Sequence, residues 1–208
     1  MDFIKEPMTI ENKSMEIIRP YLDKLNLPQE QIAVYSRMIH ASGDPDYANW
    51  VKFHTEAIKK AANALENGAD IFCDVEMVRT GINKKRLADF GGKVHCLIAD
   101  EEVAVKAKEL GITRSMMAMR IFGEKLHGAV VAIGNAPTAL FELLEMMEKS
   151  EIRPACIVGV PVGFVGAAES KQALVDLSPV PYITVLGNKG GSPIAASAIN
   201  AMLYRKGR

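Results

Sequence analysis

The spacing of hydrophobic positions changes near Gly68. Before this residue, apolar side chains recur at helical spacing, beginning with Met15, Ile18 and Leu22. Two further amphipathic runs cover residues 28–39 and 51–66. We therefore predict that residues 1–67 form a helical N-terminal extension. Pro20 is expected to kink or restart the first helix, because proline removes a helical hydrogen bond.

After Gly68, short apolar runs alternate with helical patterns. The apolar runs are residues 70–75, 93–98, 129–133, 155–160 and 182–186. The helical patterns are residues 101–110, 113–125, 138–148, 168–177 and 193–204. Continuous apolar strands that alternate with helices are typical of a parallel sheet covered on both faces. The sequence predicts one α/β domain over 1–208, whose core, 68–208, is a three-layer, flavodoxin-like, five-stranded parallel sheet of order 2-1-3-4-5.

The composition argues against a nucleic-acid-binding, membrane-spanning or secreted protein. The 208 residues include 25 basic and 25 acidic side chains, so no basic surface for nucleic acid is indicated. No run of 18 apolar residues occurs, and the first residues lack the features of a signal peptide. The cysteines, Cys73, Cys96 and Cys156, each lie in an apolar run, as expected of buried thiols in a cytoplasmic protein. We expect neither a metal site nor a membrane partner.

The stretch 36–44 combines a helix end with a histidine. Gly43 indicates a glycine stop, and Arg37 and His40 are spaced to share one helical face. The partial negative charge of a helix C-terminus favours a protonated imidazole by about 0.3–1 kcal/mol. His40 is therefore a candidate proton donor, although a histidine that only caps the last carbonyls fits the same pattern.

Glycines follow three of the predicted strands. The candidate ligand positions in these loops are Gly134, Asn135, Gly163, Gly166, Gly190, Gly191 and Ser192. Ligands of open α/β sheets bind beyond the carboxyl ends of strands, and glycine lets backbone amides approach them closely. Ser192 precedes Pro193, a good helix start whose free amides favour an anion. Any one of these loops could equally be only a turn.

A second polar cluster precedes the helical pattern at 113–125. Thr113 is a natural helix N-cap, and Ser115 follows within the first turn. Arg114 would stand in that same turn, where a cation is unfavourable unless a bound carboxylate pairs with it. Arg114 is therefore a candidate carboxylate ligand, alongside a simple surface role.

Motifs for other chemistries are missing or broken. Pro161 occupies the first position of a potential G-x-G-x-x-G, which moreover follows the fourth strand and not the first. The chain has no phosphate-binding P-loop, no G-x-S-x-G elbow and no H-E-x-x-H. These observations count against nucleotide, hydrolase and zinc chemistry.

Several of these stretches together resemble the precorrin-8X methylmutase family of corrinoid biosynthesis, which includes the cobalt-precorrin-8 methylmutases. The matching stretches are RMIHA (37–41), CDVEM (73–77), TRS (113–115), VVAIGNAPTAL (130–140) and PVGFVGAAESK (161–171). They occur in the family's order and span nearly the whole chain.

The resemblance implies an isomerase of cobalamin biosynthesis. It implies that a ring-C methyl group moves from C-11 to C-12, that His40 is the proton donor and acceptor, and that Ser14 and Arg37 contact the substrate. It further implies a homodimer with sites near the subunit interface, and the reaction needs no cofactor. Two alternatives remain open at this point: a carrier that binds a corrinoid without reacting it, and a nucleotide-dependent enzyme on a doubly wound sheet.

Overall fold

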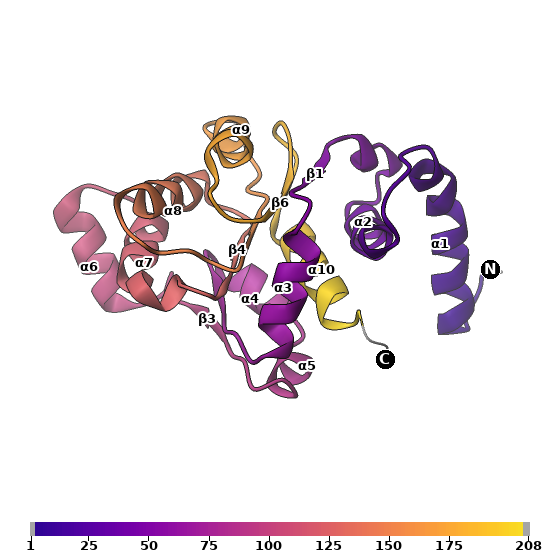
Figure 1. Ribbon diagram of the computed structural model, residues 1–208, viewed down its shortest axis with the longest axis horizontal. Coiled ribbons are helices and arrows are strands. Elements are labelled where there is room, and N and C mark those ends of the chain that lie inside the picture. Colours follow the sequence, from indigo (N-terminus) through magenta and orange to yellow (C-terminus); the bar gives the residue numbers. More distant parts are fainter. Residues whose placement is uncertain (1–2, 206–208) are drawn as a thin grey trace.

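A six-stranded mixed sheet forms the centre of the molecule in the computed structural model, which describes residues 3–205 (Figure 1). The strands are β1 (Val51–Phe53), β2 (Ile71–Cys73), β3 (Val94–Cys96), β4 (Val130–Ile133), β5 (Cys156–Gly159) and β6 (Tyr182–Val185). Their order across the sheet is β1-β6-β5-β4-β2-β3. All neighbours pair in parallel except β1, which runs antiparallel to β6 with Val51 opposite Val185.

Helices precede, follow and connect these strands. The α-helices of the first half are α1 (Pro7–Asp23), α2 (Gln29–Ser42), α3 (Ala57–Glu66), α4 (Glu76–Gly81), α5 (Lys84–Ala88) and α6 (Glu101–Leu110). Those of the second half are α7 (Arg114–Phe122), α8 (Pro137–Lys149), α9 (Ala167–Leu177) and α10 (Ser192–Leu203). Two 3₁₀ turns, η1 (Pro45–Asn49) and η2 (Gly123–Leu126), complete the chain. No helix among the described residues is both long and apolar enough to cross a bilayer.

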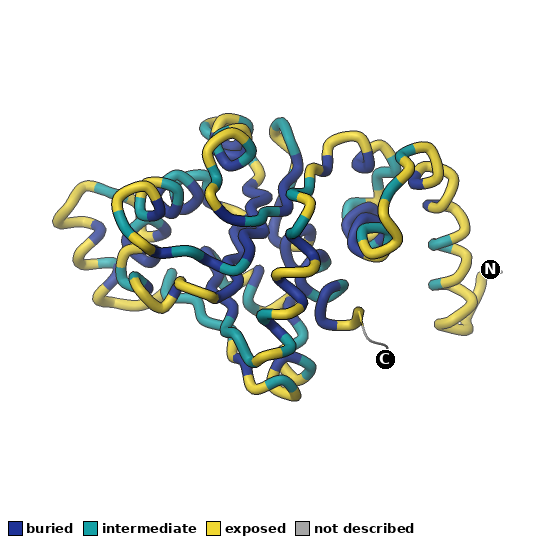
Figure 2. The backbone as a smooth tube through the Cα atoms, in the orientation of Figure 1, coloured by how far each residue is buried: buried dark blue, intermediate teal, exposed yellow. Residues whose placement is uncertain are grey.

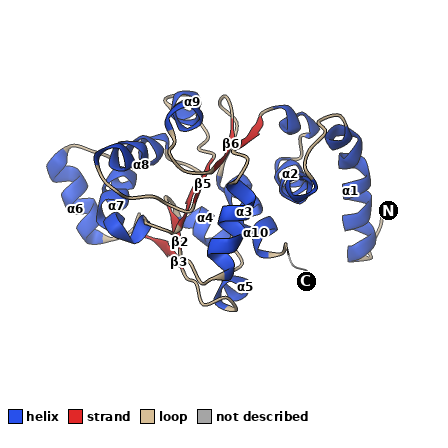
Figure 3. Ribbon diagram, viewed as in Figure 1, coloured by secondary structure: helices blue, strands red, loops and turns tan. Residues whose placement is uncertain are grey.

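The sheet separates two hydrophobic cores, because successive residues of a strand point to opposite faces. On β4, Val130 and Ala132 join the core with α2, α3 and α10, whereas Val131 and Ile133 join the core with α6, α7 and α8. Figure 3 shows the strands running between these two groups of helices, and the central strands β2, β4 and β5 are buried along their whole length. Figure 2 shows the buried residues gathered at the centre of the molecule. Since both faces are covered, the strands carry the continuous apolar runs seen in the sequence.

The predicted sheet was incomplete. A purely parallel, five-stranded sheet is wrong, because β1 adds a sixth strand in antiparallel orientation. The parallel strands follow the order β3-β2-β4-β5-β6 within the larger sheet. The region 1–67 is correspondingly not all helix: Val51–Phe53 is a strand, and the helix predicted over 51–66 begins only at Ala57. The pairing of β1 with β6, which lies far along the chain, overrides the local helical pattern.

Three smaller corrections concern helices. Pro20 lies inside α1, which continues through it to Asp23 and does not restart. The stretch after β2, for which the sequence predicts no helix, contains the short helix α4, which begins just after Val75. The helix predicted over 113–125 ends at Phe122, since Gly123 takes a positive φ of 51° that breaks the regular helix.

Candidate active site

A large cavity lies where α1, α2 and α10 meet. It has a volume of about 1200 Å³, and its lining includes Arg37 and His40 from α2. α1 contributes Glu11 and Met15, and α10 with its C-cap residue Tyr204 contributes a polar wall that includes Ser197 and Asn200. In Figure 1, α2 lies between the other two helices, which come from opposite ends of the chain. The structure therefore brings two predicted site residues together in a space suited to a large ligand.

His40 stands in the last turn of α2, as predicted. The helix ends at Gly43, which adopts a left-handed conformation with φ 65° and donates its amide to the carbonyls of Ile39 and His40. Because the backbone of Gly43 satisfies these carbonyls, the imidazole is not needed as their cap. The His40 side chain is exposed and makes no hydrogen bond or ion pair within residues 3–205. It is thus free to approach a ligand in the cavity.

Arg37 lies one turn before His40 and is half-buried. Its Nη2 atom donates to Glu11 Oε1 at 2.5 Å, so the guanidinium already holds a carboxylate of α1. In the structure, therefore, the carboxylate partner of Arg37 is supplied by the protein itself, and a substrate contact of Arg37 stays a prediction. Glu11 was not expected from the sequence, because nothing local indicates that α1 folds back over α2.

Ser14 is close to this cavity but does not line it. It lies within α1 and not at a helix start, since Glu6 caps the helix, and its hydroxyl donates to the Ile10 carbonyl at 2.8 Å. Ser14 stands one turn after Glu11, which does line the cavity. A substrate contact of Ser14 would require its hydroxyl to leave the Ile10 carbonyl, and this role stays a prediction.

Asp74 organises the carboxyl edge of the sheet. It follows β2, is fully buried, and accepts the amides of Gly134, Asn135 and Ala136 at 3.0, 2.8 and 2.7 Å. Burial raises the pKa of the Asp74 carboxyl, while the backbone amides act in the opposite direction. Asp74 thereby fixes the loop after β4. An aspartate directly after a buried strand was the signal in the sequence, but it does not tell which loop will bind it.

The glycine loops meet at this edge, yet much of their polarity is used internally. A Cβ at Gly134 would collide with the backbone of Ser192, and one at Gly190 would collide with the Val160 carbonyl. The amide of Gly191 donates to Val160 at 2.8 Å, and that of Gly163 donates to the Asn188 carbonyl at 3.1 Å. Gly166 serves as the N-cap of α9. Close backbone packing therefore explains Gly134 and Gly190, and a positive φ explains Gly163, Gly166 and Gly191. Substrate contacts at Gly134, Asn135, Gly163, Gly166, Gly190, Gly191 and Ser192 remain predictions.

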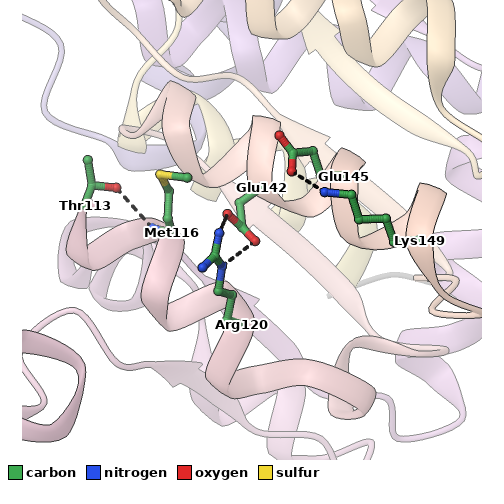
Figure 4. Close-up of polar contacts among 6 residues, drawn as sticks. All are labelled: Thr113, Met116, Arg120, Glu142, Glu145 and Lys149. Atoms are coloured by element: carbon green, nitrogen blue, oxygen red, sulfur yellow. Dashed lines mark hydrogen bonds and ion pairs between the residues drawn. The ribbon is translucent and has the colours of Figure 1, made fainter. Parts of the chain in front are cut away.

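The cluster at the start of α7 lies apart from the cavity. Thr113 caps the helix by accepting the amide of Met116, as Figure 4 shows, and its hydroxyl also bonds Thr138 at 2.9 Å. Arg114 is exposed in the first turn, and Ser115 is buried. None of Thr113, Arg114 and Ser115 lines the cavity that holds His40 within the described residues.

Further along α7, the side chains bind its neighbour α8. Arg120 makes two hydrogen bonds to the buried Glu142, at 2.7 and 2.9 Å, and Figure 4 shows these contacts beside the Glu145–Lys149 ion pair. The middle of α7 thus anchors the helical layer opposite α2, and its polar residues need no ligand to explain them.

The amino-acid sequence is similar to those of known methylmutases along nearly its whole length. A family model described as precorrin-8X methylmutase matches residues 9–205. The chain is 43% identical over 202 residues to the precorrin-8X methylmutase of Sinorhizobium sp, with 97% of this chain and 96% of the relative covered. It is 41% identical over 197 residues to the cobalt-precorrin-8 methylmutase of Priestia megaterium, with 95% and 87% covered.

A solved structure gives the same picture. The structure reported as precorrin-8x methyl mutase from Thermus thermophilus superposes with a TM-score of 0.81 at 36% identity, covering 93% of this chain and 95% of that chain.

Proposed function

The chain belongs to the precorrin-8X methylmutase family, and we propose that it shifts the ring-C methyl group of precorrin-8 or cobalt-precorrin-8 from C-11 to C-12, with His40 as proton donor and acceptor. It is an isomerase of cobalamin biosynthesis. One observation carries the assignment of the site: Arg37 and His40 lie together in a cavity large enough for a macrocycle.

The reaction places modest demands on the protein. A methyl shift around a conjugated ring needs no external methyl donor, but the ring must be held and its electron distribution biased. Arg37 binds an acidic side chain on the rim of the macrocycle, in place of Glu11. The exposed His40 imidazole then donates a proton or hydrogen bond near ring C and recovers it after the shift. Cobalt, where present, is part of the substrate.

The direct test of this function is an absorbance time course with metal-free precorrin-8 and, separately, its cobalt form. Conversion of either substrate to the corrin chromophore establishes the methyl shift, and the faster substrate identifies the natural one. Tight binding without a spectral change in either case would instead favour a corrinoid carrier.

Arg37→Ala should raise the dissociation constant of the macrocycle about 10- to 100-fold while lowering kcat less. The reason is that one charge-assisted hydrogen bond contributes about 1.5–3 kcal/mol. The measurement is an absorbance titration with the product, hydrogenobyrinate, combined with turnover of precorrin-8. Glu11→Gln is the matched control, because it breaks the same ion pair but keeps the arginine. An unchanged dissociation constant for Arg37→Ala rules out its role as substrate ligand.

We also propose that the enzyme is a cytoplasmic homodimer. Phe164 and Val165, in the loop after β5, are 91% and 90% exposed, and neighbouring Val162 is also exposed. Such a contiguous apolar loop is typical of a surface that another protein covers. Its place next to the loops at the carboxyl edge of the sheet supports a second copy near the site. The unpaired thiols of Cys73, Cys96 and Cys156 agree with a reducing compartment.

Phe164→Asp should weaken the dimer at least about 10-fold, because it places a charge in an apolar interface. Sedimentation velocity over a concentration series measures the dissociation constant. The wild-type protein is expected at twice the mass of the chain. A variant that dimerises as tightly as the wild type would show that this loop lies outside the interface.

A further inference from the structure

A second, smaller cavity lies beside the end of α2. Its volume is about 380 Å³, and its lining includes Ala41, Ser42, Asp44, Lys189 and Gly190. Ala41 lines both this cavity and the larger one that contains Arg37 and His40. The two cavities are therefore neighbours at Ala41, the residue after His40, so a large ligand at His40 lies within a short distance of the second cavity.

Lys189 gives the second cavity its cation. It is the one basic side chain in the lining formed by residues 3–205, and it pairs there with the one acidic side chain, Asp44. The hydrogen bond from Lys189 holds the pKa of the Asp44 carboxyl below its ordinary value. Because about half of the Lys189 side chain is exposed, its partner can be exchanged at low cost.

A buried lysine fixes the backbone behind this cation. Lys171 on α9 has no exposed surface, and its Nζ atom donates to the Lys189 carbonyl at 2.5 Å. Within the described residues no carboxylate pairs with Lys171, and burial lowers its pKa to about 8. The contact from Lys171 ties α9 to the backbone of the loop that carries Lys189. Gly190 packs against the Val160 carbonyl with no room for a Cβ, which further fixes the loop.

We propose that the second cavity is a carboxylate subsite, in which Lys189 binds a peripheral acid group of the macrocycle held by Arg37 and His40. The macrocycle carries several acidic side chains around its rim, and Arg37 can bind only one of them. Lys189 lines the second cavity, which shares Ala41 with the first, and offers a second anchor. On binding, the substrate carboxylate replaces Asp44 at Lys189. This inference rests on the proposed function, since it concerns the same ligand.

Two substitutions that break the same ion pair test the proposal. Lys189→Met removes the cation and should raise the dissociation constant of hydrogenobyrinate about 10- to 100-fold. Asp44→Asn removes the internal competitor and should lower that constant about two- to fivefold. Asparagine retains an acceptor for the Asp46 amide, which Asp44 caps at 3.0 Å, so the turn after α2 keeps its bond. Lys149→Met, which breaks the exposed pair with Glu145, is the matched control. It should leave the dissociation constant of hydrogenobyrinate unchanged.

The sign of the two effects decides the result. If the ion pair between Lys189 and Asp44 only anchors the loop, both variants shift the dissociation constant in the same direction, and the subsite is overturned. An unchanged constant for Lys189→Met overturns it equally. Conversion of precorrin-8 by the wild-type enzyme, followed in the same preparation, separates this outcome from failure of the proposed function: the function fails only if the wild type neither binds nor converts the macrocycle.

Discussion

His40→Ala should lower kcat about 10²–10⁴-fold and leave the dissociation constant of the macrocycle close to that of the wild type. The expected split follows from the position of the imidazole. It is exposed in the lining of the larger cavity, so its removal costs little packing. The backbone of Gly43 already satisfies the last carbonyls of α2, so the helix end survives. What the variant lacks is the group that we propose exchanges a proton with ring C.

The measurement combines stopped-flow absorbance with precorrin-8, product titration and thermal unfolding. His127→Ala is the matched control, since His127 is another exposed histidine and lies in the turn before β4, where it bonds the Glu151 carbonyl at 3.0 Å. We expect that control to retain full turnover. Equal losses of affinity and turnover in His40→Ala would indicate a structural role for His40, and full turnover with normal binding would remove it from the reaction.

The position of His40 was predictable because its causes are local. The apolar spacing of residues 28–39 defines α2, and Gly43 ends it, so the sequence places Arg37 and His40 on one face near a helix terminus. The cavity around them was not predictable in this way. Its other walls come from α1 and α10, and only the folded chain brings these helices to α2. The partner of Arg37, Glu11, was missed for the same reason.

The errors in the predicted fold also have a physical cause. β1 has only the residues Val51–Phe53, too few to show the alternation that distinguishes a strand, and it forms because β6 offers a free edge. α4 is likewise too short for helical periodicity to appear. The buried strands β2, β4 and β5 were found correctly because each carries a continuous apolar run between glycines or polar residues.

The glycine loops illustrate how one signal supports two interpretations. Glycine at Gly134 and Gly190 was read as a means for a ligand to approach the backbone. In the structure, another part of the backbone makes that approach: Ser192 at Gly134, and Val160 at Gly190. A sequence shows that a close approach is needed but does not show what approaches. The same limit applies to Asp74, whose partners are three consecutive amides of a distant loop.

Asp74→Ala should lower the free energy of unfolding by about 3–5 kcal/mol. It leaves the buried amides of Gly134 and Ala136 without an acceptor, at about 1–3 kcal/mol each, and also frees the more exposed amide of Asn135. Asp74→Asn should cost less, about 2 kcal/mol, since one amide oxygen is retained while the NH₂ group faces backbone donors. Urea unfolding at pH 7 measures both variants. We expect the loop after β4 to lose its fixed position against Ser192 in each.

Glu76→Gln is the control for this prediction. Glu76 lies two residues further along the same segment, but its carboxylate is partly exposed and pairs with Arg79 at 2.7 Å, an interaction worth less than about 1 kcal/mol at a surface. The difference between the two variants in the free energy of unfolding therefore measures the effect of burial and backbone hydrogen bonds, because both variants lose a negative charge. If Asp74→Ala costs no more than Glu76→Gln, the amides must find acceptors elsewhere, and Asp74 does not hold the carboxyl edge of the sheet together. A cost several times larger identifies it as the residue on which the packing of the loops after β4 and β6 depends.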